Sequence, residues 1–427
     1  MKVLIFLFVL FLGLNIAYSQ STDLEYYIEQ AKVNSPLINS KMNDNKILQL
    51  DLEQIQTILS KPVVNLEANM LFAPIISHES DKNSFQWISE GATDYTGYDL
   101  SYSDGGQYQA FFTIKQPLFR GSQRQTFSEA AKINEDLNEN QIDLTVHELE
   151  QLVNHQYILC LKAERQAEIS KELLDELSRQ TAIMEELVNH AIYRQTDLML
   201  LQIEKKNYQL QYTNFSVEYV NALYDLNLLC GINNAQLVHI QDVDFEMKPD
   251  TVIHSQFLQS YTLDSLKTIS QQSIYELKYK PQLNVFADAG LNAIYLPGLN
   301  RFGFSTGISF AWNIFDGNQK KLQQQKSDIR LETLEFEKRN FVTRHDLNKR
   351  KYLAQIQSVD SKLSLVDKQL VDYKTLLEMY LDEMTQAQIS IMDYKNLYKD
   401  IAAKKQEKVL LQMEKQALIN SYNYWNY

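Results

Sequence analysis

The pentapeptide Pro117-Leu118-Phe119-Arg120-Gly121 leads into a stretch, residues 122–230, that contains neither glycine nor proline. Residues 318–427 form a second such stretch, so all 7 prolines and 12 glycines lie elsewhere. Because these two residue types interrupt helices, both stretches are predicted to be helical over many turns. At about 1.5 Å per residue, each long outgoing helix would reach roughly 100 Å. A compact globule of this length would have a radius of only about 22 Å, so an elongated protein is expected.

The junction in front of each helical stretch is repeated in the sequence. Residues 118–123, LFRGSQ, correspond to residues 314–319, IFDGNQ. Farther along, Asp197 and Asp393 stand at the same distance from the phenylalanine of their own junction. An internal repeat of this kind predicts two similar halves, with a helix turn at residues 190–196 and another at the equivalent place in the second half.

Four segments alternate between apolar and polar side chains, at residues 63–72, 107–118, 283–292 and 302–314. Period two is typical of strands. Each segment has about the ten residues that a tilted strand needs to cross a bilayer, with one apolar and one polar face. The side chains that we expect to face lipid are Leu66, Met70, Phe112, Ile114, Val285, Leu291, Phe304, Ile308, Phe310 and Trp312.

An ordinary half-buried sheet covered by a helix would show the same alternation. The flanking helices are too long to fold back over so small a sheet, which favours strands in a membrane. Four strands cannot close a barrel, and an open edge in hydrocarbon leaves backbone groups unpaired. Several chains must therefore pool their strands. Two copies would give a barrel filled by side chains, whereas three would leave an aqueous bore, and the polar faces favour three.

The expected fold class is α+β and mainly α. The predicted order is a signal peptide (1–19), helices (20–61), a β-hairpin with a long extracellular loop (62–118), a long helical hairpin (119–231), a linker (232–262), a helix (263–280), a second β-hairpin (281–315) and a second long helical hairpin (316–427). The acidic residues of loop 73–106 match no EF-hand spacing, so a solvated loop is favoured over a calcium or partner site.

The net charge of the chain limits its possible partners, and its first residues indicate where it is located. The chain has 41 Lys and Arg against 54 Asp and Glu, a net charge of -13, which argues against a nucleic-acid partner. A basic start, an apolar run over residues 3–17 and a small-residue site with cleavage after Ser19 predict a secretory signal. No later segment has the roughly 20 apolar residues of a membrane helix. No cysteine follows the signal, so no lipid anchor is implied.

The sequence shows no motif typical of a metal site or of an enzyme active site. Cys160 and Cys230 are the only cysteines, and a disulfide is allowed in an exported protein. The predicted helix geometry offsets them by roughly 10 Å, beyond disulfide reach, so buried free thiols are expected. The 7 histidines show no metal-ligand spacing, and there is no phosphate-binding glycine loop or nucleophile elbow. We expect no metal, no cofactor and no enzyme.

A signal peptide, helices leading to a two-stranded unit, a long helical hairpin and a repeat of the whole arrangement, with LFxG and IFxG junctions, resemble the TolC family of outer-membrane efflux proteins. The resemblance covers nearly all of the mature chain. It implies a homotrimer in the outer membrane of a Gram-negative-type cell, with a twelve-stranded β-barrel continuous with a periplasmic helical tunnel. The implied partners are outer-membrane lipid, a periplasmic adaptor (membrane fusion) protein and an inner-membrane transporter, which supplies the energy.

The resemblance also assigns roles at the helix turns. The family has a glycine there, followed six residues later by aspartate. Asp197 and Asp393 match the aspartates, but Ala191 and Ala387 replace the glycines. The residues that would dock the adaptor are Ala191, Ile192, Tyr193, Arg194, Thr196, Ala387 and Ser390.

A periplasmic aperture is implied at the same end. In the best-studied member type, the second aspartate and an acid three residues later form charged rings, and here those positions hold Asp393 and Asn396. Met384 and Ile389 replace a latching tyrosine and arginine, which predicts an aperture held by packing more than by hydrogen bonds. The aperture set is Asp393, Asn396, Asp197, Met384 and Ile389. A ring of Asp393 would favour cations; alternatively, Asp197 and Asp393 are only first-turn helix acids.

The function that this implies is a passive exit duct of a tripartite efflux pump, opened by contact with adaptor and transporter. Type I protein secretion is an alternative within the same architecture, since the cargo depends mostly on the transporter. A different class, a secreted coiled-coil adhesin or structural protein, would share the signal and the helices but would not need lipid-length strands.

Overall fold

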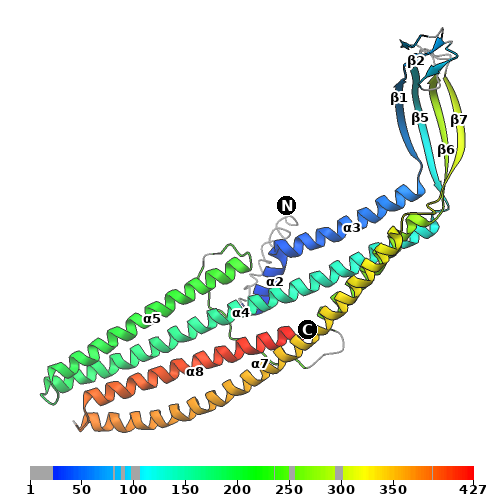
Figure 1. The fold of residues 1–427 in the computed structure, drawn as a ribbon. Coiled ribbons are helices and arrows are strands. Elements are labelled where there is room, and N and C mark those ends of the chain that lie inside the picture. The colour runs from blue at the N-terminus through cyan, green and yellow to red at the C-terminus, as the bar shows by residue number, and fades with distance from the viewer. Residues whose placement is uncertain are drawn as a thin grey trace, which may run out of the picture. The chain divides into compact units, whose positions relative to one another are not determined.

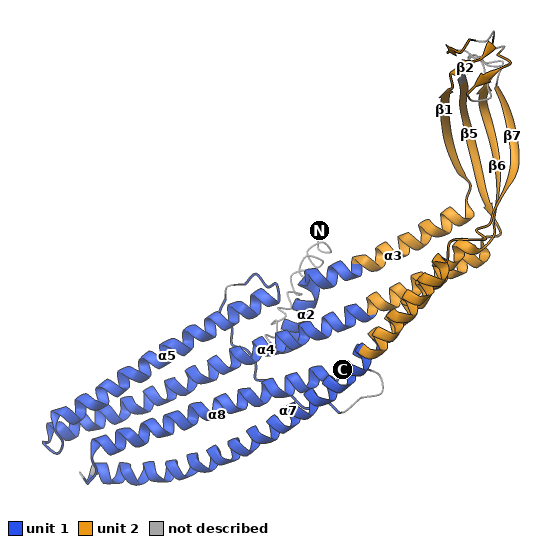
Figure 2. Cartoon of the chain, in the orientation of Figure 1, with its two compact units in different colours: residues 1–42, 140–259, 337–427 blue, residues 43–139, 260–336 orange. Residues whose placement is uncertain are grey.

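The computed structural model describes residues 23–79, 82–87, 92–97, 106–234, 236–249, 255–293, 302–386 and 388–427. The signal peptide predicted over residues 1–19 lies outside them. The chain divides into two compact units (Figure 2): unit 1 holds residues 1–42, 140–259 and 337–427, and unit 2 holds residues 43–139 and 260–336. Unit 1 is helical, whereas unit 2 contains the strands.

The helices of the first repeat are α2 (Leu24–Asn34), α3 (Pro36–Ser60), α4 (Gly121–Asn189) and α5 (Gln195–Leu229) (Figure 1). Asp23 caps α2, because its side chain accepts a hydrogen bond of 3.0 Å from the backbone N–H of Tyr26. Pro36 is the first residue of α3, a position where its missing N–H costs nothing. The helix turn predicted within residues 190–196 is confirmed.

The second repeat holds α6 (Gln256–Glu276), a 3₁₀ turn η3 (Leu277–Tyr279), α7 (Gln319–Thr385) and α8 (Ile391–Trp425). Helix α6 begins at Gln256, within the segment predicted to be a linker. Phe257 in this added turn packs against Phe341 and Tyr424, with ring centroids 5.6 Å from each. Tertiary contacts of this kind extend a helix beyond what its own sequence indicates.

Residues 236–249, within the predicted linker, form no regular element. Side chains from neighbouring helices bond this backbone in place of a second strand. Tyr219 donates to the Val238 carbonyl at 2.6 Å, Tyr157 donates to the Gln241 carbonyl at 2.6 Å, and Gln416 accepts from the Phe245 N–H at 2.7 Å. The extended backbone is therefore satisfied without a sheet.

The main sheet consists of β1 (Val63–Phe72), β5 (Gly106–Leu118), β6 (Gln282–Ala293) and β7 (Phe302–Ala311). Their order is β1-β5-β6-β7, and every neighbouring pair is antiparallel. The pairing of β5 with β6 joins the two repeats in one sheet, with β1 and β7 as its edges. All four predicted strands are confirmed, but β7 ends at Ala311, so Trp312 follows the strand.

A second, smaller sheet lies in the connection between β1 and β5. It consists of β2 (Ile75–Ser77), β3 (Ser84–Gln86) and β4 (Tyr95–Thr96), in the order β3-β2-β4. The loop predicted over residues 73–106 therefore contains short strands, rather than being only a solvated connection.

One hydrophobic cluster of unit 1 lies among α2, α4 and α5. It includes Tyr27, Tyr157, Leu223 and both cysteines. Cys160 and Cys230 are buried and free, as predicted, and burial raises the pKa of each thiol to about 12. At neutral pH both are thiols that pack as small apolar groups.

Helix α5 ends in a glycine cap. Gly231 has a positive φ of 64°, its N–H bonds to the Leu228 carbonyl at 3.2 Å, and the Ile232 N–H bonds to the Asn227 carbonyl at 2.8 Å. These two bonds define a Schellman motif. A Cβ added at Gly231 would stand 2.7 Å from the Cβ of Asn34, whose amide donates to the Cys230 carbonyl at 2.9 Å.

We expect Gly231→Ala to destabilise unit 1 by roughly 1–2 kcal/mol or more, because alanine is disfavoured at positive φ and the contact with Asn34 must also open. The measurement is thermal unfolding of the purified protein followed by its helical circular dichroism. Gly121→Ala is the matched control, since Gly121 begins a helix and has open space around its Cα. Equal melting temperatures for the two variants would contradict the prediction.

Candidate functional site

One face of the main sheet is apolar across all four strands. The register aligns Leu66 with Phe112, Phe112 with Ala289, and Ala289 with Phe304. Side chains two residues away lie on the same face. The register therefore brings the residues expected on the apolar face together, which are Leu66, Met70, Phe112, Ile114, Val285, Leu291, Phe304, Ile308 and Phe310. Phe304, the third residue of β7, is 88% exposed.

The opposite face is mostly polar. Lys115 pairs with Glu67 across β5 and β1 at 3.7 Å, and Ser305 donates to Asp288 across β7 and β6 at 3.1 Å. Phe286 also lies on this face, and its ring covers Gly307, where a Cβ would come within 2.6 Å of Phe286 Cζ. The sheet thus separates an apolar surface from a surface that water can wet.

Just beyond the last strand, Trp312 donates from its indole Nε1 to the Tyr279 carbonyl at 3.1 Å. Tyr279 in turn donates to the carboxylate of Asp316, which also accepts from the Lys320 N–H at 2.7 Å. These contacts fix the junction between β7 and α7. In the first repeat, Arg120 at the equivalent position donates to Asn284 at 3.2 Å and to Gln123 at 2.8 Å.

The turn between α4 and α5 is a second Schellman motif. Ala191 has a φ of 59°, its N–H bonds to the Val188 carbonyl at 2.9 Å, and the Ile192 N–H bonds to the Leu187 carbonyl at 2.9 Å. Ala191 therefore adopts the left-handed conformation that glycine would favour. At the turn between α7 and α8, Gln388 makes the equivalent bond to the Glu383 carbonyl at 2.9 Å. Ala387 lies outside the described residues.

The two aspartates differ in their local roles. Asp197, in the first turn of α5, accepts a hydrogen bond of 3.1 Å from the Arg194 N–H, which closes the start of its helix. At α8, Ser390 is the N-cap instead and accepts from the Met392 N–H at 3.2 Å. Asp393 is exposed in the first turn of α8, and Asn396 is exposed one turn later. Asp197 thus serves as a helix cap, whereas the cap of α8 does not use Asp393.

Tyr193 links the two helix turns. Its hydroxyl lies 3.1 Å from the carbonyl oxygen of Met384 and 3.1 Å from that of Ile389. Met384 and Ile389 are buried, and their backbone carbonyls accept these hydrogen bonds from Tyr193. Tyr193 is half-buried because it contacts the second turn. Of the residues predicted to dock the adaptor, five are exposed in the structure: Ala191, Ile192, Arg194, Thr196 and Ser390.

A tyrosine-rich cluster fills the space behind the turns. Tyr394 and Tyr398, one helical turn apart on α8, pack with Tyr208 of α5 and Leu177 of α4. Tyr398 donates to the Leu173 carbonyl at 2.7 Å. The Tyr394 hydroxyl is buried without a partner among the described groups, and burial raises its pKa. The spacing of four residues between Tyr394 and Tyr398 is the signal in the sequence for this buried helix face.

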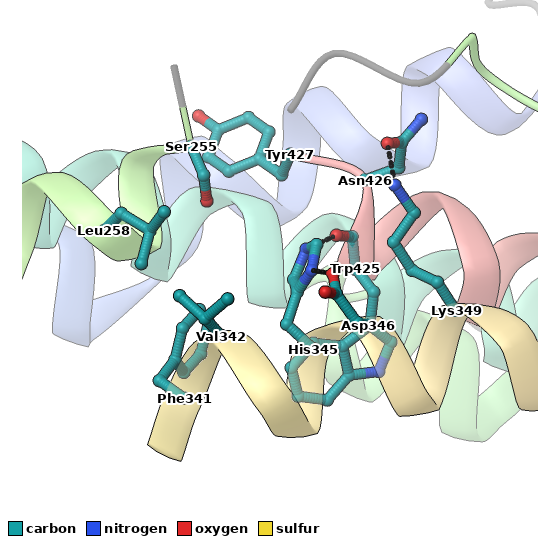
Figure 3. Close-up of a pocket in the computed structure, with 10 residues that line it drawn as sticks. All are labelled: Ser255, Leu258, Phe341, Val342, His345, Asp346, Lys349, Trp425, Asn426 and Tyr427. Carbon is teal, nitrogen blue, oxygen red and sulfur yellow. Dashed lines mark hydrogen bonds and ion pairs between the residues drawn. The ribbon is translucent and has the colours of Figure 1, made fainter. Parts of the chain in front are cut away.

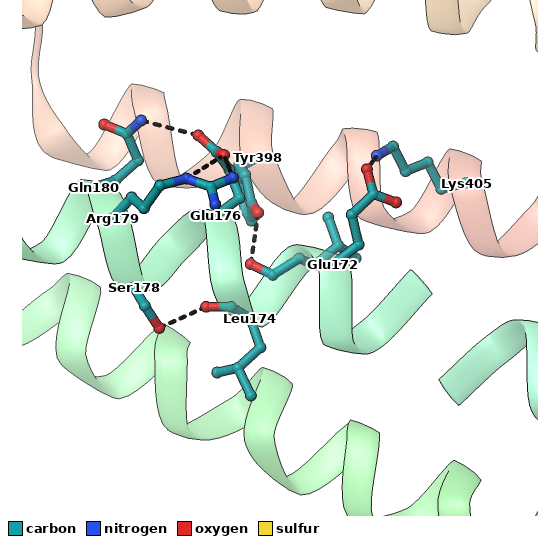
Figure 4. Close-up of polar contacts among 9 residues, drawn as sticks. Glu172, Leu174, Glu176, Ser178, Arg179, Gln180, Tyr398 and Lys405 are labelled. Carbon is teal, nitrogen blue, oxygen red and sulfur yellow. Dashed lines mark hydrogen bonds and ion pairs between the residues drawn. The ribbon is translucent and has the colours of Figure 1, made fainter. Parts of the chain in front are cut away.

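Charged contacts surround this cluster (Figure 4). Lys405 of α8 pairs with Glu172 of α4 at 2.8 Å, while Arg179 and Gln180 of α4 both bond to Glu176. The Gln180 contact is the main reason why the pKa of Glu176 is lowered. These groups bond to one another across or along helices, which is typical of structural contacts on a solvated helix surface.

The C-terminal residues line a small pocket (Figure 3). His345 bonds to the carbonyl of Trp425, and Lys349 donates to Asn426 at 3.0 Å. Close by, His147 stacks on Tyr427 with ring centroids 3.8 Å apart, and burial lowers the His147 pKa. These contacts fasten the chain end. Among the residues that the structure describes, no group of three or more His, Cys, Asp or Glu could hold a metal ion.

We expect Tyr193→Phe to raise the hydrogen-exchange rates of the Ile192 and Gln388 amides roughly 5- to 30-fold. Two carbonyls lose their shared donor, which corresponds to about 1–2 kcal/mol of local stability. The measurement is exchange followed by mass spectrometry. Tyr212→Phe, farther along α5, is the control and should leave these amides unchanged. Unaltered exchange in Tyr193→Phe would show that the link does not stabilise the turns.

In the part of the chain that the structure describes, no helix has the length and apolarity needed to cross a membrane. No protein-family model matches the sequence, and no curated protein matches it either. Solved structures do match.

The outer-membrane protein VceC of Vibrio cholerae is 12% identical with a TM-score of 0.70, over 94% of this chain and 95% of VceC. The CmeC outer-membrane channel of Campylobacter jejuni is 12% identical with a TM-score of 0.67, over 94% of this chain and 85% of CmeC. The open MtrE outer-membrane channel of Neisseria gonorrhoeae is 11% identical with a TM-score of 0.68, over 94% and 88%. The chain thus has the mainly helical fold of these channel proteins, as the sequence predicted.

Proposed function

We propose that this chain is an outer-membrane channel-tunnel that serves as the exit duct of a tripartite efflux pump. The observation that carries the proposal is the four-stranded sheet, which has one exposed apolar face, one polar face and, within the described residues, two edges without a further strand. Strands of about ten residues with such faces suit a bilayer on one side and an aqueous bore on the other. The fold shared with VceC, CmeC and MtrE supports this assignment.

The functional unit is a homotrimer. In the described residues, β1 and β7 each have a neighbour on only one side, and an unpaired edge is costly in hydrocarbon. Three copies close a barrel wide enough for water. Helix α5 supports self-association, because Ile203, Leu210, Val217 and Tyr224 are exposed at intervals of seven residues. An apolar stripe of this period fits the side of another helix.

The helices would extend into the periplasm, where the turns meet an adaptor protein and an inner-membrane transporter. Ile192, Arg194 and Thr196 are exposed at the first turn and Ser390 at the second, so these side chains are accessible to a partner. The chain acts as a passive conduit whose opening follows from contact with these partners. A soluble adhesin would leave the apolar face of the sheet in water, which argues against that alternative.

The aperture lies at the helix turns in this proposal, with Asp393 of three subunits as a charged ring and Asn396 beside it. The exposure of Asp393, and the use of Ser390 as the cap of α8, support a role beyond helix capping. Met384 and Ile389 anchor the turn through Tyr193, and Asp197 caps α5. A ring of carboxylates at a constriction favours cations over anions.

The membrane position of the sheet can be tested with two adjacent substitutions. Phe304→Arg places a charge on the apolar face and should cost about 2–4 kcal/mol per chain if Phe304 lies near the bilayer midplane. We expect little heat-modifiable trimer in the outer-membrane fraction. Ser305→Arg, on the opposite face beside Asp288, should assemble normally. Equal assembly of both variants, or a soluble extracellular product, would contradict the proposal.

The aperture can be tested by conductance in planar bilayers. Asp393→Asn removes three charges from the ring, so both the preference for cations and the block by divalent cations should fall several-fold. Asp400→Asn, seven residues later on the exposed side of α8, is the control. Selectivity unchanged by Asp393→Asn would leave that residue with a role only at its helix terminus.

A further inference from the structure

The connection between β1 and β5 carries an exposed apolar patch formed by Phe72, Ile76, Phe85 and Trp87. Their exposed fractions are 46%, 42%, 57% and 64%. The rings of Phe72 and Trp87 stack with centroids 5.7 Å apart and planes 22° apart. Phe85 meets Trp87 edge-on at 5.0 Å, and Ile76 lies opposite Phe85 in the pairing of β2 with β3. Four neighbouring apolar side chains thus form one surface, which we call the aromatic patch.

The small sheet holds the aromatic patch in place. Along β2, Ile75 and Ser77 are buried while Ile76 points outward, so the two sides of this strand differ. His78 bonds through its two ring nitrogens to Asn83 and to Thr96, each at 2.7 Å. Glu79 accepts from the N–H and the hydroxyl of Thr93 at 2.8 and 3.0 Å. Thr96 pairs with Ile76 in the register of β2 with β4, and His78 stands two residues beyond Ile76, so the His78 contacts lie on the same face as the aromatic patch and border it.

The aromatic patch continues the apolar face of the main sheet. Phe72 is the last residue of β1 and stands two residues beyond Met70, so it shares the face that carries Leu66 and Phe304. Within unit 2, the helices attach where β1 and β6 begin and where β5 and β7 end. Phe72 lies at the opposite end of the sheet, where Figure 1 shows β2.

We propose that the aromatic patch rests on the outer leaflet of the outer membrane, at the boundary between the acyl chains and the headgroups of the lipid. The proposal rests on the proposed function, which places the apolar face in the bilayer and the helices in the periplasm. Tryptophan is enriched at this boundary because its ring is apolar and its N–H is polar. Lys82 and Ser84, exposed beside the patch, suit the headgroup level. The aromatic patch then extends the lipid contact beyond β1.

The three tryptophans of the chain allow a direct test, since Trp87, Trp312 and Trp425 lie in different places. Trp312→Phe combined with Trp425→Phe leaves Trp87 as the reporter. The full-length trimer is reconstituted in phosphatidylcholine vesicles with bromines placed near the top or near the end of the acyl chains. We expect Trp87 fluorescence to be quenched strongly by shallow bromines, weakly by deep bromines and weakly by iodide in the water.

Two further single-tryptophan proteins separate this proposal from the proposed function. Phe304→Trp, in a chain whose three native tryptophans are replaced by phenylalanine, should be quenched by deep bromines, and Trp425 alone should not respond to lipid. Quenching of Phe304→Trp without quenching of Trp87 would overturn the patch proposal and leave the channel intact. If neither is quenched, the membrane position of the sheet fails as well.

The remaining outcomes also decide the question. Full quenching of Trp87 by iodide would place the loop in water, and protection from both quenchers would place it against protein, such as a second copy of this chain. Either result overturns the proposal. If the multiple variants do not form heat-modifiable trimers, the difference in bromine quenching between the unmodified chain and Trp87→Phe reports on Trp87 with one substitution. No difference would again overturn it.

Discussion

The backbone hydrogen bonds at the two edges of the main sheet are the constraint on which the whole assembly depends. Among the residues that the structure describes, β5 and β6 have a neighbouring strand on both sides, whereas β1 and β7 each have one on a single side. In water, such an edge can bond to solvent, but in hydrocarbon its N–H and C=O groups have only other strands as partners. Under the proposed function, copies of the same chain complete this sheet, and the exposed apolar residues of α5 and of the sheet belong to surfaces that these copies and lipid would cover.

The same sheet divides the tasks of its side chains. Its apolar face carries mainly Leu, Ile, Val, Met, Phe and Ala. Its polar face carries cross-strand pairs such as Ser305 with Asp288, together with the ring of Phe286 over Gly307. The Phe286 ring occupies the space that a side chain at position 307 would need, and glycine leaves that space open. This combination suits a sheet that contacts lipid on one face and water on the other.

Much of this organisation could be predicted because long-range periodicity is written directly in the residues. The absence of Gly and Pro over residues 122–230 and 318–427 predicted the long helices, and strict alternation predicted the four strands. The start of α6 was missed because Phe257 is held in helix by aromatic side chains that come from distant parts of the chain. Residues 236–249 were predicted as part of a linker, but the tyrosine hydroxyls and the glutamine side chain that bond their backbone come from distant parts of the chain and could not be predicted. At the turns, sequence placed Asp197 and Asp393 on equal terms, although a serine cap on α8 makes them different.

The contact of Tyr193 with the second turn is a link between two helix turns that a comparison of amino-acid sequences would not reveal. Its hydroxyl bonds to the main-chain oxygens of Met384 and Ile389, and every amino acid supplies such an oxygen. The side chains at those two positions are therefore constrained only by the apolar space around them, and exchange for other residues of similar volume would keep the fastening. Two proteins could therefore link their helix turns by the same tyrosine hydrogen bond while having different amino acids at both accepting positions.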